Sequence, residues 1–261
     1  MFISNDRKLY LQKLRREKII VSILRLLILI MFLVGWEVLA RLELINTFTF
    51  SSPSKVLETF IELIKDGSLF RHVGITLYEI LISFSIASIV GLVVATILWN
   101  SPTISKIIDP YLTILNSLPK VALGPLIIIW VGASIDSIIF MSLLISLFIT
   151  IINIYNGFIN TDKNYIILMK SFGATKWQIF RKVVLPSNYN NIISALKINI
   201  SMNLIGVIMG ELLVSKNGIG YLIMFGSQVF NIDLVLTGVF ILGIISYLMY
   251  FIIEKIDLSK K

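Results

Sequence analysis

The stretch SFGATKWQIFRKVVLP, residues 171–186, separates two long apolar runs and resembles neither of them. It is basic, it carries Trp177 and Phe180 among lysine and arginine residues, and it ends at Pro186. The apolar runs on its two sides, about residues 135–158 and 191–214, are each long enough to cross a bilayer as an α-helix, which takes about 20 residues. The stretch therefore predicts a loop between two membrane-spanning helices.

The composition of the whole chain agrees with a membrane protein. Of its 261 residues, 57% are hydrophobic, and the mean hydropathy is +0.91, whereas soluble domains are about 45–50% apolar. We interpret the net charge of +8 as a topology signal and expect no nucleic-acid partner, because basic residues mark the cytoplasmic loops of membrane proteins. The lack of cysteine excludes disulfides, thiolate metal sites and cysteine nucleophiles. We expect an all-α, polytopic membrane protein without a metal site.

Six apolar segments are predicted to span the membrane. The first follows a basic tail and is longer than the roughly 7–15 apolar residues of a signal peptide, so we expect it to be retained. The third is interrupted at Pro119 and Pro125. The six segments lie at about residues 19–40, 73–99, 107–131, 135–158, 191–214 and 234–253.

Lysine and arginine divide unequally between the two sides of this six-helix arrangement. Fifteen lie in the two tails and in the loops after the second and fourth segments, and five lie on the other side. Because cytoplasmic loops carry the excess of basic residues, we expect both termini and the loop at 159–187 in the cytoplasm. The predicted parts are a cytoplasmic basic tail (1–18), the first transmembrane helix (19–40), an external segment (41–70), a core of five transmembrane helices (71–256) and a cytoplasmic tail (257–261). In the external segment, Ser52, Pro53 and Gly67 predict the cap, first turn and end of an amphipathic helix.

The cytoplasmic loop is longer than a connection between two helices requires, and it keeps large apolar residues. Leaving Phe172 or Trp177 in water is unfavourable, since burying such a side chain contributes about 1.5–3 kcal/mol. These residues therefore either lie on the bilayer surface or fill a pocket on another protein. Gly173 permits a tight turn. Pro186 is expected to push Leu185 out of helical conformation and to begin the next helix, which gives a short helix pair on a hinge.

The same loop resembles the signature of the membrane subunits of ATP-binding-cassette (ABC) importers. In that signature an acidic-Ala-Ala triplet is followed by a glycine and, further on, by a hydrophobic-x-Leu-Pro ending. Gly173 occupies the place of the glycine, and VVLP at 183–186 matches the ending. The triplet is replaced by ILM at 167–169. The salt bridge that a Glu would make there is therefore not expected, and contact with an ATPase would rest on apolar packing.

Two further stretches resemble the branch of this family for nitrate, sulfonate, taurine and related small solutes. They are LPKVALGPLIIIWVGAS at 118–134 and GELLVSKNGIGYLI at 210–223, and the likeness runs from about residue 71 to residue 254. It implies the type I importer permease fold in a bacterial plasma (inner) membrane. The solute would be sulfonate-, nitrate- or taurine-like, or a vitamin precursor.

The resemblance also implies partners. Two permease subunits, most simply a homodimer, would form the pathway, and an extracytoplasmic solute-binding protein would deliver the solute. Two cytoplasmic ATPase subunits would bind ATP and Mg. This chain has no GxxxxGK[ST] motif, so it is expected to bind no nucleotide or other cofactor and to catalyse no reaction.

By the same resemblance, residues 165–186 form the loop that couples the permease to the ATPase. The predicted coupling residues are Phe172, Gly173, Ala174, Trp177, Phe180, Arg181, Leu185 and Pro186.

Candidates for the pathway are polar or helix-breaking residues within the spans, because such residues there serve either transport or packing. Serine and asparagine also form helix–helix hydrogen bonds worth about 0.6 kcal/mol on average, and this alternative stays open. The pathway candidates are Asn116, Ser117, Pro119, Asn199, Asn203 and Glu211. Lys120 and Lys197 are the basic residues nearest the interior of the spans. They either extend toward the membrane surface or, if they face a cavity, favour an anionic solute.

Two other classes of protein were weighed. A secondary, ion-coupled transporter normally shows repeated halves with acids at corresponding positions, and residues 19–131 and 135–253 share no visible pattern. An intramembrane lipid-modifying enzyme would need a catalytic group, and the sequence has one histidine, no HExxH and no GxSxG. An enzyme that uses carboxylates alone stays open, although nothing in the sequence groups the acids.

Overall fold

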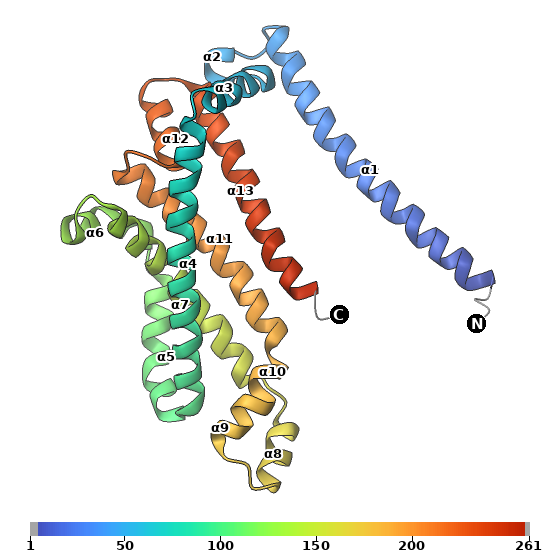
Figure 1. Cartoon of the computed structure of the whole chain (residues 1–261), viewed down its shortest axis with the longest axis vertical. Helices are drawn as coiled ribbons and strands as arrows, with labels where there is room; N and C mark the ends of the chain where they lie inside the picture. Colours follow the sequence, from blue (N-terminus) through green and yellow to red (C-terminus); the bar gives the residue numbers. More distant parts are fainter. Residues whose placement is uncertain (1–4, 259–261) are drawn as a thin grey trace.

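The computed structural model describes residues 5–258, and over that range every regular element is a helix (Figure 1). Five of these helices are long and apolar enough to cross a membrane unaided. They are α1 (Asn5–Arg41), α4 (Ser68–Asn100), α7 (Ile135–Ile159), α11 (Tyr189–Val214) and α13 (Ile232–Leu258). Of the predicted tails, residues 1–4 and 259–261 lie outside the described range, and the other residues continue α1 and α13.

The third predicted span is a bent pair of helical segments, and it makes a sixth span if the pair crosses the membrane as one unit. α5 is Pro102–Ser117, and it is followed by η1 (Lys120–Leu123) and α6 (Gly124–Val131). The two parts are bent by 82°. The break falls at Leu118 and Pro119, where Leu118 is extended (φ −63°, ψ 142°), as expected before a proline. The interruption predicted at Pro119 is present, whereas Pro125 lies in the first turn of α6 and interrupts nothing.

Helices α4, α7 and α11 pack closely at the centre of the bundle. Gly206 and Gly210 lie on the side of α11 that faces α7, and a Cβ atom on Gly206 would lie 2.4 Å from the Cα atom of Ser142. Two small residues four apart are typical of close helix pairs in membranes, because they let the backbones approach. Ile80, from α4, is fully buried in the adjoining apolar core.

Short helices occupy the two ends of the bundle (Figure 1). At one end lie α2 (Thr47–Phe50), α3 (Pro53–Lys65) and α12 (Ile219–Gln228), and at the other end lie α8 and α9, whose bounds are given below. α3 begins as predicted, since the Lys55 N–H donates to Ser52 Oγ at 3.4 Å and Pro53 lies in the first turn. Gly67 follows its end at φ +76°. α12 was not predicted from the sequence.

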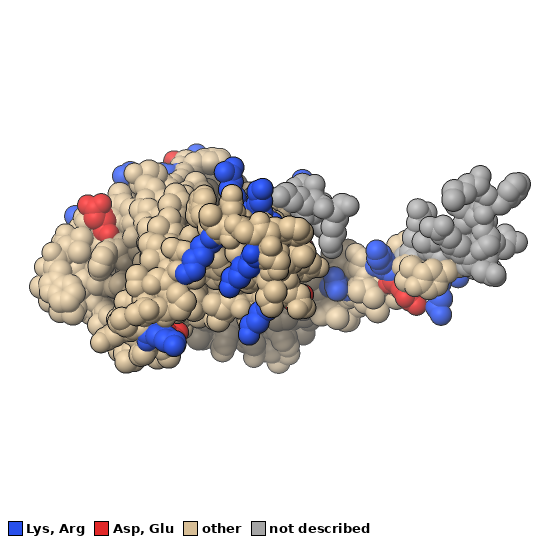
Figure 2. Space-filling model, turned by 90° about the horizontal axis from the view of Figure 1, so that it is seen from below, with Lys and Arg blue, Asp and Glu red and all other residues tan. Residues whose placement is uncertain are grey.

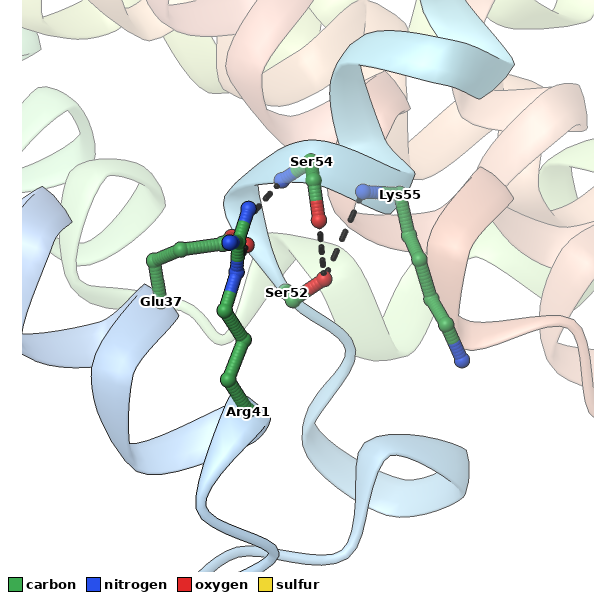
Figure 3. A network of polar contacts seen from close by, with 5 residues as sticks. All are labelled: Glu37, Arg41, Ser52, Ser54 and Lys55. Carbon is green, nitrogen blue, oxygen red and sulfur yellow. Dashed lines mark hydrogen bonds and ion pairs between the residues drawn. The ribbon is translucent and has the colours of Figure 1, made fainter.

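Helix α1 stands away from the rest of the molecule along most of its length (Figure 1), and none of its apolar window is buried. It is held near its C-terminal end. Trp36 stacks on Phe240 of α13 with ring centroids 6.3 Å apart. The carboxylate of Glu37 accepts from Arg41 Nε at 2.7 Å and from the Ser54 N–H of α3 at 3.1 Å (Figure 3). These contacts attach α1 to the same end of the bundle as α3.

Candidate functional site

The loop between α7 and α11 is almost entirely helical. It contains α8 (Lys163–Ser171), α9 (Lys176–Ile179), a π-helical turn η2 (Phe180–Val184) and α10 (Leu185–Ser187). Gly173 stands between α8 and α9 at φ +72°, a conformation that glycine adopts without strain. Thr175 caps α9, because its Oγ1 accepts from the Gln178 N–H while Gln178 Oε1 accepts from the Thr175 N–H. The helix pair that was expected around Gly173 is present.

The expectation for Leu185 was wrong. Leu185 is helical, with φ −62° and ψ −48°, although it precedes Pro186. A π-helical turn comes directly before, in which the Leu185 N–H donates to the Phe180 carbonyl. The wider turn leaves room for the proline ring, which would otherwise meet the carbonyl four residues earlier. The helical conformation breaks instead at Asn188 (φ −100°, ψ 11°).

The base of the loop is closed by hydrogen bonds of Asn188. Its Nδ2 donates to Thr161 Oγ1 at 2.7 Å and to the Val184 carbonyl at 2.8 Å. Thr161 lies at the beginning of the loop and Asn188 at its end, so the two ends are tied together. Both residues are buried.

The inward face of the loop is fixed in the bundle by Phe180. This side chain is 4% exposed. Its ring lies 5.3 Å from that of Trp99 on α4 and 5.4 Å from that of Phe158 on α7, centroid to centroid. Ile179 and Val184 are buried beside it. Because one aromatic side chain contacts two spans, the loop and the bundle should move as one body.

The outward face of the loop carries large apolar side chains that the described part of the chain leaves mostly exposed. Phe172 is 78% exposed and Trp177 is 63% exposed, and Ile167 and Leu168 on α8 are also exposed. Exposed lysine and arginine residues surround them, and the view from this end shows mainly basic side chains among the charged ones (Figure 2). The exposed basic residues of the loop are Lys163, Lys170, Lys176, Arg181 and Lys182. Bulky apolar groups within a basic rim are typical of a protein-binding surface.

The structure separates the predicted coupling residues by exposure. Five lie on the exposed face, two are half-buried and Phe180 is buried. Contact with another protein could therefore involve the exposed five directly, while Phe180 holds the loop in place. Their roles in coupling stay predictions. The exposed residues are Phe172, Gly173, Trp177, Arg181 and Pro186, and the half-buried ones are Ala174 and Leu185.

Two of the predicted pathway residues lie inside the helix packing of this chain. Asn199 and Asn203 are fully buried, and Asn203 Nδ2 lies 2.5 Å from Asn199 Oδ1. Ser142 Oγ of α7 donates to Asn203 Oδ1 at 2.7 Å, and Asn199 Nδ2 donates to Ser88 Oγ of α4 at 2.9 Å. These bonds join the three central helices, so both asparagines make the helix–helix hydrogen bonds that were the alternative to a place in the pathway.

The other pathway candidates are distributed differently. Asn116 is half-buried, and Ser117 and Pro119 are exposed at the break of the bent span. Glu211 is 1% exposed near the C-terminal end of α11. The structure therefore does not gather the six candidates into one cavity, and their place in a pathway stays a prediction.

Glu211 instead holds the beginning of α12. Its Oε2 accepts from the Gly220 N–H at 2.5 Å, and its Oε1 accepts from Thr76 Oγ1 of α4 at 2.6 Å. Thr76 Oγ1 in turn accepts from the Ile219 N–H at 2.9 Å. His72 Nδ1 accepts from the Gly218 N–H at 3.0 Å. Three successive N–H groups at the N-terminus of α12, which have no partner within the helix, are thus satisfied by side chains of α4 and α11.

The same arrangement explains why glycine occupies position 218 in the sequence NGIG (217–220), which leads into α12. A Cβ atom on Gly218 would lie 2.2 Å from Glu211 Oε1, and Gly218 has φ +103°. Glu79, one turn further along α4 than Thr76, is fully buried beside Glu211. We refer to Glu211, Thr76 and His72 as the α12 clamp. Sequence reasoning missed it, and the only signal was a carboxylate seven residues before a Gly-x-Gly turn.

The family model described as binding-protein-dependent transport system inner membrane component matches residues 87–259. The chain belongs to this family. It is a multi-pass, non-catalytic permease subunit of the ABC importers, in the sulfonate- and taurine-like branch, which confirms the prediction from the three motifs.

Comparison with individual proteins supports this family assignment. The chain is 33% identical over 232 residues to an ABC transporter permease protein of Haemophilus influenzae, covering 88% of this chain and 93% of that one. It is 27% identical to the formylaminopyrimidine transport permease protein ThiX of Halalkalibacterium halodurans, over 88% of this chain and 92% of the relative. Among solved structures, a chain of the MetNI methionine ABC transporter matches with a TM-score of 0.66 and 22% identity, over 74% of this chain and 96% of that chain. This last likeness shows the fold.

Proposed function

We propose that this chain, with a second copy of itself, forms the membrane pathway of an importer for a small solute and is driven by a separate ATPase bound to residues 165–186. The observation that carries the coupling role is the pair of exposed aromatic residues, Phe172 and Trp177, on a loop whose other face is anchored by Phe180. An ATPase that moves these aromatics would move α4, α7 and α11 with them. ATP and Mg would be bound by that partner.

The solute class is supported by the names of the relatives. Besides the formylaminopyrimidine permease, the chain is 26% identical to the taurine transport system permease protein TauC of Escherichia coli, over 85% of this chain and 82% of the relative. We propose a small organic or inorganic solute delivered by an extracytoplasmic binding protein. The second copy of the permease is proposed from the resemblance to ABC importers, in which two permease subunits form the pathway.

The orientation of the subunit is also proposed. Five basic residues lie on the exposed face of the α8–α10 loop, and the N-terminal end of α1 and the C-terminal end of α13 lie toward that side of the molecule (Figure 1). Because basic loops stay in the cytoplasm, this side and both termini would be cytoplasmic. The ATPase would then meet the loop on the side where ATP is available.

The test is co-purification of the tagged chain with the ATPase and binding protein of its own transporter after extraction in a mild detergent. We expect the ATPase to elute with the permease, and the complex to hydrolyse ATP faster when the loaded binding protein is added. An aromatic residue exposed at the other end of the bundle, Phe230 (71% exposed), provides the control: Phe230→Asp should retain the ATPase and Trp177→Asp should release it. A permease that elutes alone and transports its solute with an ion gradient would contradict the proposal.

A further inference from the structure

Lys120 places a positive charge near the middle of the membrane. Its Nζ lies 3.3 Å from the carbonyl oxygen of Ile145 in α7. At a rise of 1.5 Å per residue, Ile145 is about 15 Å from one end of α7 and about 21 Å from the other. The hydrocarbon core of a bilayer is about 30 Å thick. The ammonium group itself, and not only the Cα atom, therefore lies far from both membrane surfaces.

No carboxylate of the described residues neutralises this charge. The ion pair found among them joins Arg41 and Glu37. Lys120 Nζ donates to Asn116 Oδ1 at 3.2 Å and to Ile145 O, and it lies 5.5 Å from the ring centroid of Phe148. All three partners are neutral. An ammonium group has three N–H donors, so these two bonds leave one donor for a ligand.

The helix end beside Lys120 offsets its charge only in part. α5 ends at Ser117, and the C-terminus of a helix carries about half a negative charge. The site is left net positive. Lys120 is half-buried, and Ser117 and Pro119 next to it are exposed. A partly exposed charge at this depth is too costly against lipid, and charged residues within membranes mark substrate or ion pathways.

We propose that Lys120 is the anion-recognition residue of the translocation pathway, and that the solute carries a carboxylate, a sulfonate or a comparable oxyanion. The inference rests on the proposed function, since it takes a pathway for granted, and it adds the charge class of the solute. The anion would accept a hydrogen bond from Lys120 Nζ. Asn116 presents its carbonyl oxygen to Lys120, which leaves its NH₂ group as a second donor to the same anion.

The absence of cysteine from the chain makes a direct test possible. Ser117→Cys introduces one thiol per permease chain, next to Lys120, in the assembled complex reconstituted in liposomes, and only labelling of the permease chain is measured. The complex is treated either with the anionic reagent 2-sulfonatoethyl methanethiosulfonate or with the cationic reagent 2-(trimethylammonio)ethyl methanethiosulfonate. Each rate is divided by the rate of that reagent with free 2-mercaptoethanol. The ratio of the two normalised rates cancels any change in the reactivity of the thiol itself.

A unit charge about 10 Å away, acting with opposite sign on the two reagents, changes this ratio at least about 4-fold at low ionic strength. We expect Lys120→Gln to lower the anionic-to-cationic ratio by that factor or more, and Lys120→Arg to preserve it. The matched control is Lys106→Gln. It removes a lysine about 16 Å from the thiol at position 117, toward the N-terminus of α5, and should leave the ratio unchanged.

Two results would overturn the inference, and they are distinguishable. If both reagents react and Lys120→Gln does not change the anionic-to-cationic ratio, Lys120 has no anion-recognition role, although the surface can still line the pathway. Failure of both reagents to react, with or without ATP, would show that this surface is shielded from water and would remove the pathway from it. Coupling is measured separately, as co-purification of the ATPase and as ATP hydrolysis stimulated by the binding protein. A failure of the proposed function in that assay is therefore distinguishable from both of these labelling results.

Discussion

Trp177→Ala is expected to raise the dissociation constant of the permease–ATPase complex by about 30-fold or more. It should also abolish the ATP hydrolysis that the loaded binding protein stimulates. Truncating an aromatic residue at the centre of an interface costs about 2 kcal/mol or more, which corresponds to that factor. Trp177 is 63% exposed in the free chain, and its ring stacks on Phe180 with centroids 5.6 Å apart, so its truncation removes this one ring contact from the internal packing. Phe172→Ala, at 78% exposure, should act in the same direction.

The stability of the variants separates this effect from unfolding. Trp177→Ala removes one stacking contact with Phe180 and should lower the thermal unfolding midpoint of the detergent-solubilised permease much less than Phe180→Ala does. Phe180→Ala, which empties the space between Trp99 and Phe158, should destabilise the chain by about 3–5 kcal/mol. Phe230→Ala, at the opposite end of the bundle, should leave ATPase binding unchanged. If Trp177→Ala supports full stimulation by the binding protein, the exposed aromatics are not the coupling contact.

Glu211→Ala is the second substitution with a large expected effect. It leaves the Gly220 N–H and Thr76 Oγ1 without their acceptor. Each unsatisfied buried group costs about 1–3 kcal/mol, so we expect a loss of about 2–6 kcal/mol, confined first to α12. The measurement is hydrogen exchange of the amides at the start of α12, where Gly218, Ile219 and Gly220 should exchange much faster than in the unmodified chain.

Two further variants sharpen the test of the α12 clamp. Gly218→Ala keeps the carboxylate but introduces a Cβ atom that would collide with it at φ +103°, so it should release α12 as well. Glu62→Ala removes an exposed carboxylate from α3 and should change the exchange of α12 little. Slow exchange at residues 218–220 in Glu211→Ala would show that the carboxylate does not hold the helix.

The long spans could be predicted because each depends on residues that are contiguous in the sequence. The apolar runs at 135–158 and 191–214 became α7 and α11 with small shifts at their ends. Pro119 broke its span and Ser52 capped α3, since both effects act on the residue's own backbone or on the next turn. Gly173 turned the chain between α8 and α9 for the same reason.

The features that sequence reasoning missed depend on partners distant in the chain. Phe180 looked like the other aromatics of its loop, and only Trp99 and Phe158 from two other helices make it a core residue. The ten residues of α12 are too few to be recognised as a span, and their N-terminus is fixed by α4 and α11. Leu185 stayed helical because a π-helical turn, which no local rule predicts, relieved the constraint of Pro186.

The central claim is that the exposed aromatic face of the α8–α9 loop is covered by a cytoplasmic ATPase. Ser171→Cys gives this cysteine-free chain one thiol in that face, beside Phe172 and without removing either aromatic residue, and its labelling by a membrane-impermeant maleimide can be followed in inside-out membrane vesicles with and without the ATPase. The account predicts rapid labelling when the ATPase is absent and protection when it is bound. Equal labelling in both preparations, or labelling only in vesicles of the opposite orientation, would contradict it.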